Sequence, residues 1–239
     1  MNIIPPLVTP QLLLGEAYQA VVSLMATHSP FPCGQANFFS QAAKMRAARI
    51  HLDETVFFGQ VAYHDLTPST TVEICAAFGI PTITMGKLFG VEGTCVDSDM
   101  HKLAVGKTIS AKLGVTLTWE QTDLFGFLRQ NAQGFRGKTL LATAAYCRDK
   151  KKGTPMGSGE KDIVEFARNN RINLALFPFR SSDIIQKGVS NERKRVETYE
   201  QILVEAGYTV RKHSTELLFR GQGAPDWFFL DILTAKCIP

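Results

Sequence analysis

Residues 70–99 read TTVEICAAFGIPTITMGKLFGVEGTCVDSD, residues 101–114 read HKLAVGKTISAKLG, and residues 115–124 read VTLTWEQTDL. Three apolar runs alternate here with segments that favour helix, and the first run leads into a turn of small residues. The second and third runs each end in an acid. Alternation of this kind predicts a parallel sheet with right-handed crossovers and helices on both faces. We therefore expect the front half of a nucleotide-binding α/β sheet.

The same alternation continues to the end of the chain. The strands that we expect are residues 71–75, 93–97, 116–121, 139–144, 172–177, 209–219 and 227–235. The helices that we expect are residues 82–89, 100–113, 124–133, 158–170 and 191–206. Only a short Gly- and Pro-containing segment, residues 221–225, separates the last two strands, which indicates an antiparallel hairpin. The fold class expected for residues 67–239 is α/β: a seven-stranded, mostly parallel, doubly wound sheet with a C-terminal antiparallel hairpin.

Residues 1–66 differ from the rest of the chain, and we expect them to form a helical N-terminal cap. Apolar residues recur at helical spacing between Pro10 and Met25. A break rich in proline follows, and a second helix is expected from Gln35 to about His51. Residues 57–63 are compatible with either a short helix or a loop.

The composition is that of a soluble globular protein. Of the 239 residues, 45% are hydrophobic and 20% are charged, and the net charge is +4. Five cysteines without a CxxC pair or zinc-finger spacing indicate free thiols, a reducing compartment and no metal site. No basic region precedes the apolar N-terminus, and no uncharged apolar run is long enough to cross a bilayer. We expect a cytoplasmic monomer or homodimer without a membrane partner.

Three acids fall at the ends of consecutive predicted strands and therefore at one edge of the sheet. They are Glu73, Asp97 and Asp123. Ligands of doubly wound sheets bind at this edge, where Asp97 can accept hydrogen bonds from ribose hydroxyls. Alternatively, Asp97 or Asp99 caps the helix that follows, since Asp is a favoured helix N-cap. Asp123 likewise fits either a helix cap or an acceptor for the exocyclic amine of a base.

These segments carry a resemblance to a known family. VEICAAFGI, TCVDSD and TWEQTDLFGF, with TVRKHSTELLFRG and DWFFLDILTAK near the C-terminus, resemble a class I S-adenosylmethionine-dependent methyltransferase over about residues 66–237. In that family the first turn reads acid-x-Gly-x-Gly-x-Gly. Glu73 and Gly79 match this pattern, whereas Cys75 and Ala77 replace the first two glycines.

The resemblance implies an enzyme that binds S-adenosylmethionine and transfers its methyl group without a metal. The cofactor-binding residues that it implies are Glu73, Cys75, Ala77 and Gly79 for the methionine part, Asp97 for the ribose, and Asp123 with Leu124 for the adenine. Most of the contacts at the first turn would come from the backbone, so small residues there allow close approach of a ligand.

The sequence gives fewer signals for the residues that would contact the molecule that accepts the methyl group. Tyr146 follows the fourth strand and is all that remains of the Asn/Asp-Pro-Pro-Tyr/Phe turn found in members that methylate exocyclic amines. His64 is the best candidate for a general base, since a cap can fold over the site. Candidate substrate-binding residues are Arg148, Arg180 and Tyr63, and two of them are cationic. We therefore expect a small or anionic substrate.

Two further functions remain open. The loss of two glycines favours a non-catalytic binding module on the methyltransferase fold. The basic segments at residues 148–152, 193–195 and 211–212 favour an RNA methyltransferase, whose binding would weaken steeply with salt. The sequence has no RNP-type aromatic and basic motif to accompany them.

Overall fold

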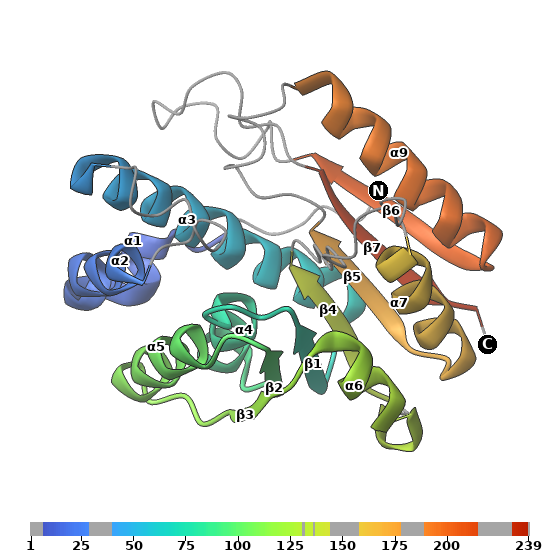
Figure 1. Cartoon of the computed structure of the whole chain (residues 1–239), viewed down its shortest axis with the longest axis horizontal. Coiled ribbons are helices and arrows are strands. Elements are labelled where there is room, and N and C mark those ends of the chain that lie inside the picture. The colour runs from blue at the N-terminus through green and yellow to red at the C-terminus, as the bar shows by residue number, and fades with distance from the viewer. Residues whose placement is uncertain are drawn as a thin grey trace.

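Within the residues that the structure describes, seven strands form one sheet in the order β3-β2-β1-β4-β5-β7-β6 (Figure 1). The computed structural model describes residues 7–28, 40–130, 132–135, 137–143, 158–177, 189–214 and 231–238. The strands are β1 (Thr70–Ile74), β2 (Glu92–Asp97), β3 (Thr118–Gln121), β4 (Thr139–Thr143), β5 (Asn173–Phe177), β6 (Tyr208–Ser214) and β7 (Asp231–Cys237). Strands β1 to β5 are parallel, and β7 runs antiparallel to β5 and β6. The predicted fold is confirmed.

The central strands were readily predicted because both of their faces are buried. Strands β1 and β5 have four buried residues after a half-buried first one. A parallel strand covered by helices on both sides forms such a continuous apolar run. The predicted bounds of the first five strands differ from the observed bounds by no more than two residues.

Helices cover both faces of the sheet (Figure 1). On one face lie α3 (Gln41–Leu66), α4 (Ile80–Phe89) and α5 (Met100–Lys112), and on the other lie α6 (Leu124–Gln130), α7 (Ser158–Asn169) and α9 (Val189–Glu205). The N-terminal helices α1 (Pro10–Leu14) and α2 (Tyr18–Thr27) pack against α3 and are joined by η1 (Gly15–Ala17). The 3-10 turn η3 (Ala132–Phe135) follows α6. In the part of the chain described here, none of the helices has the length and apolar content needed to span a bilayer.

Helix α3 is longer than predicted. The expected helix ended near His51 and residues 57–63 were left between helix and loop, whereas one helix runs from Gln41 to Leu66. It begins where the Ser40 hydroxyl accepts a hydrogen bond from the Ala43 N–H at 3.2 Å. Gly59 lies inside this helix without interrupting it. A Cβ at this position would lie only 2.6 Å from the Pro81 carbonyl oxygen on α4. A close helix–helix contact therefore explains this glycine.

The same helix contributes to two apolar cores. Towards its C-terminus, Phe58 and Leu66 pack into the core of the sheet, and the Phe58 ring stacks on Phe177 with centroids 5.6 Å apart. Towards its N-terminus, Leu52 and Val56 join a second core with α2, α4 and α5. The division into a cap (residues 1–66) and a domain (residues 67–239) stays a prediction, but α3 is packed into both.

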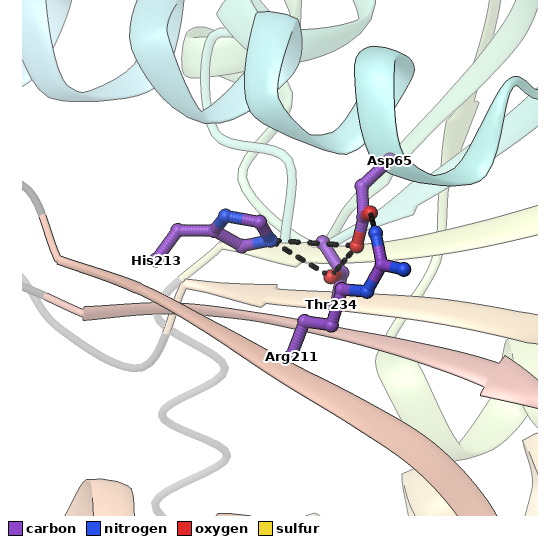
Figure 2. Close-up of polar contacts among 4 residues, drawn as sticks. All are labelled: Asp65, Arg211, His213 and Thr234. Atoms are coloured by element: carbon purple, nitrogen blue, oxygen red, sulfur yellow. Dashed lines mark hydrogen bonds and ion pairs between the residues drawn. The ribbon is translucent and has the colours of Figure 1, made fainter. Parts of the chain in front are cut away.

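A polar cluster around the buried Asp65 and Thr234 joins the C-terminal end of α3 to the last two strands (Figure 2). Asp65 accepts a hydrogen bond from Arg211 Nη1 at 2.6 Å and another from the Thr234 hydroxyl. His213 Nε2 lies 3.1 Å from Thr234 Oγ1 and 3.4 Å from Asp65 Oδ2. Burial alone would raise the pKa of Asp65, but the hydrogen bonds from Thr234 and Arg211 and the electrostatic effect of the nearby His213 and Arg211 side chains hold that pKa below its usual value.

Candidate functional site

The turn between β1 and α4 adopts an unusual backbone conformation. Cys75, Ala77 and Gly79 have φ angles of 52°, 49° and 65°, all in the left-handed region. Left-handed backbone costs a residue with a side chain roughly 1–2 kcal/mol, whereas glycine tolerates it. Cys75 and Ala77 therefore hold a conformation that glycine adopts more readily, against their intrinsic preference.

Three hydrogen bonds hold this turn against the neighbouring strand and against itself. The Ala76 N–H donates to the Val96 carbonyl at 3.0 Å, the Ala77 N–H donates to Asp97 Oδ2 at 2.8 Å, and the Gly79 N–H donates to the Ala76 carbonyl at 2.7 Å. Of the two replacement side chains, that of Ala77 is buried and that of Cys75 is partly buried. Ala77 is buried in the second core, and Cys75 packs against the core of the sheet.

Asp97 ends β2 beside this turn, as predicted for a ribose-binding acid. Its Oδ2 accepts from Ala77, and its Oδ1 accepts from the Asp99 N–H at 2.8 Å. A carboxylate offers about four acceptor positions, so each oxygen of Asp97 retains one. Asp99 is the N-cap of α5, where it accepts from the N–H groups of His101 and Lys102. Of the two acids, Asp99 is thus the cap, and ribose binding by Asp97 stays a prediction.

Glu73 lies beneath the turn rather than on its surface. It is fully buried, and its Oε2 accepts from the Thr82 N–H at 3.1 Å and from the Thr82 hydroxyl at 2.7 Å. Thr82 is in the first turn of α4, where a carboxylate is favoured by unpaired N–H groups and the helix dipole. Burial and the charge of Glu73 together raise the pKa of the neighbouring Cys95 thiol. Contact between Glu73 and a ligand stays a prediction; its visible role is to fix the start of α4.

Asp123 caps α6, as one of its two interpretations predicted. Its Oδ1 accepts from the Gly126 N–H at 2.8 Å, and its side chain is exposed at the end of β3. The adjacent Leu124 is buried in the core of the sheet. Asp97 and Asp123 follow neighbouring parallel strands and share the carboxyl edge of the sheet. Adenine binding by Asp123 and Leu124 stays a prediction.

The structure does not bring His64 and Tyr63 to this edge. The Tyr63 ring stacks on Phe89 with centroids 3.7 Å apart, and the His64 ring meets Phe89 edge-on at 5.2 Å. Phe89 is the last residue of α4, so it lies near the amino ends of the parallel strands. Burial lowers the pKa of His64. Five residues of β1 span roughly 15 Å, which separates both side chains from the turn after that strand.

The remaining predicted residues, Tyr146, Arg148 and Arg180, lie outside the described part of the chain. No group of three or more His, Cys, Asp or Glu side chains among the described residues is placed to hold a metal ion. The sequence reasoning overlooked His51, whose ring meets Phe78 in the turn at 6.0 Å between centroids.

Comparison with solved structures identifies the fold. Over 95% of this chain and 93% of its own, cofactor-bound Rv0187 from MTB superposes with a TM-score of 0.58 at 13% sequence identity. An O-methyltransferase family protein from Burkholderia thailandensis gives a TM-score of 0.54 at 12% identity, over 95% of this chain and 70% of its own. The chain has the fold of a class I methyltransferase.

The comparisons that support this methyltransferase fold are all comparisons of structure. No protein-family model matches the sequence, and no curated protein matches it either. In doubly wound sheets, ligands bind outside the carboxyl ends of the strands. The left-handed turn, Asp97 and Asp123 all lie at that edge.

Proposed function

We propose that this protein binds S-adenosylmethionine at the turn after β1 and at Asp97, and that it transfers the methyl group to a small acceptor. The observation that carries the proposal is the turn itself. It keeps three left-handed residues in the order of the family's glycines although two of them have side chains. Strained backbone of this kind persists where surrounding structure imposes it, and it concentrates at ligand-binding sites.

The residues present fit this cofactor. Ala77 is buried in the second core, and Cys75 is partly buried against the core of the sheet, so both small side chains leave room for backbone atoms of the turn to approach a ligand. Asp97 retains acceptor capacity for two hydroxyls, and one Asp123 oxygen is not used in capping α6. Bound cofactor would supply an activated methyl group. The protein would contribute binding, orientation and exclusion of water, which are the main requirements of such a transfer.

The residues that we propose to contact the methyl acceptor are chosen by their positions in the sequence, just after strands β4 and β5. Strands β4 and β5 end at residues 143 and 177, at the same edge as Asp97. Tyr146, Arg148 and Arg180 follow these strands closely in the sequence. We keep them as the proposed acceptor-side residues, whereas Tyr63 and His64 are dropped because they contact Phe89 at the opposite edge.

The RNA alternative loses support from one of its three basic segments. Arg211 is bound to Asp65, and Lys212 Nζ lies 3.8 Å from Glu200. Both cations are therefore already opposite acids in the folded chain. The other two segments fall where side chains are not described. The non-catalytic module remains the principal competitor.

Calorimetric titration with S-adenosylmethionine and S-adenosylhomocysteine tests the proposal. We expect binding with a Kd on the order of micromolar, and at least about tenfold weaker binding by Asp97→Ala, because two charge-assisted hydrogen bonds are lost. Asp99→Asn is the matched control, since it removes a charge two residues away and keeps a good N-cap. Absence of binding by folded wild-type protein would favour the non-catalytic module. Equal binding by Asp97→Ala would refute the assignment of the ribose site.

A further inference from the structure

The indole ring of Trp119 lies against two glycines that belong to different elements. Trp119 is on β3, opposite Cys95 of β2, and is partly buried against the second core. A Cβ on Gly79, in the turn after β1, would lie 2.9 Å from Trp119 Cη2, and a Cβ on Gly106, within α5, would lie 2.5 Å from the same atom. Real Cβ atoms do not come so close, so the outer edge of the ring fits because neither position has a side chain.

Gly106 also lets α5 approach the turn itself. A Cβ at this position would lie 2.5 Å from the Phe78 carbonyl oxygen. Glycine within a helix is less favourable than alanine, so a glycine there usually has a packing reason. The Phe78 side chain is fully buried in the second core. Close packing against Trp119 and α5 therefore confines residues 78 and 79 of the turn.

This confinement acts on a turn whose backbone is unfavourable. Cys75 and Ala77 hold φ angles of 52° and 49°, in the left-handed region that residues with a side chain disfavour. Such a conformation persists where the surrounding structure imposes it. Relaxation of either residue would move the backbone of Gly79, and the Trp119 ring together with Cys95 Sγ leaves Gly79 little room to move.

We propose that Trp119 is a positioning residue, which keeps the turn left-handed although two of its residues are not glycine. It acts through Gly79 and does not need to touch a ligand. This role rests on the proposed function, because it takes the backbone of the turn as part of the cofactor site. It also assigns the work of the two missing glycines to a packing contact from β3.

Titration with S-adenosylhomocysteine tests this role. Trp119→Phe keeps an aromatic ring but shortens it at the edge that meets the two glycines. We expect its apparent Kd to be about tenfold higher than that of wild type, because only a fraction of the molecules then holds a turn competent to bind. Gly106→Ala should have a similar effect, since its Cβ overlaps both the ring and the Phe78 carbonyl.

Gly86→Ala is the matched control for Gly106→Ala. It adds a methyl group to a glycine within α4, and the Cβ would lie 2.6 Å from Val115 Cγ1 instead of against the turn. Both variants replace a helix glycine and both crowd a neighbour. Gly86→Ala should nevertheless keep the Kd within about twofold of wild type, because it shares no contact with the turn.

A rescue experiment separates positioning from a merely structural role. Glycine at residue 77 tolerates the left-handed backbone by itself, so it removes part of the preference that Trp119 opposes. The double variant Ala77→Gly with Trp119→Phe should therefore bind at least about threefold more tightly than Trp119→Phe alone. Ala77→Gly in the presence of the full ring should gain less. A protein whose core is merely loosened would not regain binding, because Ala77→Gly removes a buried methyl group and fills no cavity.

Amide hydrogen exchange in ligand-free protein reports on the turn without any cofactor. The Ala77 N–H donates to Asp97 Oδ2, and the Gly79 N–H donates to the Ala76 carbonyl. In Trp119→Phe both amides should exchange at least about tenfold faster than in wild type, through local opening of the turn. In Gly86→Ala their exchange should match that of wild type.

The outcomes distinguish this role from the proposed function. Unchanged exchange at Ala77 and Gly79 in Trp119→Phe overturns the positioning role. So does cofactor binding by Trp119→Phe that equals wild type, or that is weakened and not regained with glycine at residue 77. If wild-type protein does not bind S-adenosylhomocysteine while exchange at the turn still depends on Trp119, the cofactor proposal fails and the positioning of the turn stands.

Discussion

A single methyl group added at Gly79 should disturb the candidate site. A Cβ on Gly79 would lie 2.7 Å from Cys95 Sγ and 2.9 Å from Trp119 Cη2, and the φ of 65° adds backbone strain. The backbone term is about 1–2 kcal/mol and the overpacking term about 1–3 kcal/mol. We therefore expect Gly79→Ala to lower the free energy of unfolding by about 2–5 kcal/mol, measured by urea denaturation.

Gly90 provides the matched control for this prediction. It ends α4 with a φ of 69°, but nothing lies within 4 Å of the position of its Cβ. Gly90→Ala should therefore lose only the backbone term, about 1–2 kcal/mol. Gly79→Ala should also weaken binding of S-adenosylhomocysteine, and Gly90→Ala should not. Equal losses of stability in the two variants would refute the argument that Cys95 and Trp119 confine the turn.

Two acids on α3 should give opposite dependences of stability on pH. Burial raises the pKa of Asp53 from 3.8 to about 6 despite the nearby Arg49, and its Oδ1 has no hydrogen-bond partner among the described residues. Folded protein then holds a proton that unfolded protein releases, so stability falls as pH rises from about 4 to about 6, by about 3 kcal/mol at 1.36 kcal/mol per unit. At pH 7.5, Asp53→Asn should be more stable than wild type by up to about 3 kcal/mol, whereas at pH 3.5 the two proteins should be equally stable. The same difference in stability at both pH values would contradict the reasoning. For Asp65, whose pKa is lowered, the stabilisation is present above pH 3.8 and is lost as pH falls through the folded pKa. Asp65→Asn should lower the free energy of unfolding by about 2–3 kcal/mol at pH 7, because it weakens the charged hydrogen bond to Arg211. The stability of this variant should also depend less on pH in acid than that of wild type. Urea denaturation over pH 2–7 measures both curves, and parallel curves would contradict this prediction.

The central strands of the sheet were predicted well because a strand that is buried on both faces is a continuous run of apolar residues. The sequence predicted α3 poorly, because that helix packs into two cores and its apolar residues do not form one clear stripe. Gly59 resembles a break in the sequence, and only its contact with Pro81 on another helix shows why it is helical. Information of that kind is absent from local sequence.

The candidate site was predicted in part. The acids at the strand ends are where the pattern placed them, and Asp99 and Asp123 are caps, as one interpretation of each allowed. The position of His64 was within reach of sequence reasoning. Leu66 ends α3 only four residues before β1 begins at Thr70, a gap of at most about 14 Å, so the end of that helix must lie near the amino edge of the strands. The burial of Glu73 under α4 depends on the packing of Thr82 and could not be read from the sequence.

The turn after β1 bears on the choice between an enzyme and a non-catalytic module. Two left-handed residues with side chains cost about 2–4 kcal/mol together, a large share of the stability of a typical domain. The hydrogen bonds to Val96 and Asp97 and the burial of Ala77 offset this cost, so the surroundings impose the conformation. Glycine is then dispensable for the shape of the turn, and its loss is not by itself a sign of a lost cofactor site. What separates the two functions is whether Asp97, already bonded to the turn, still accepts hydrogen bonds from a ligand.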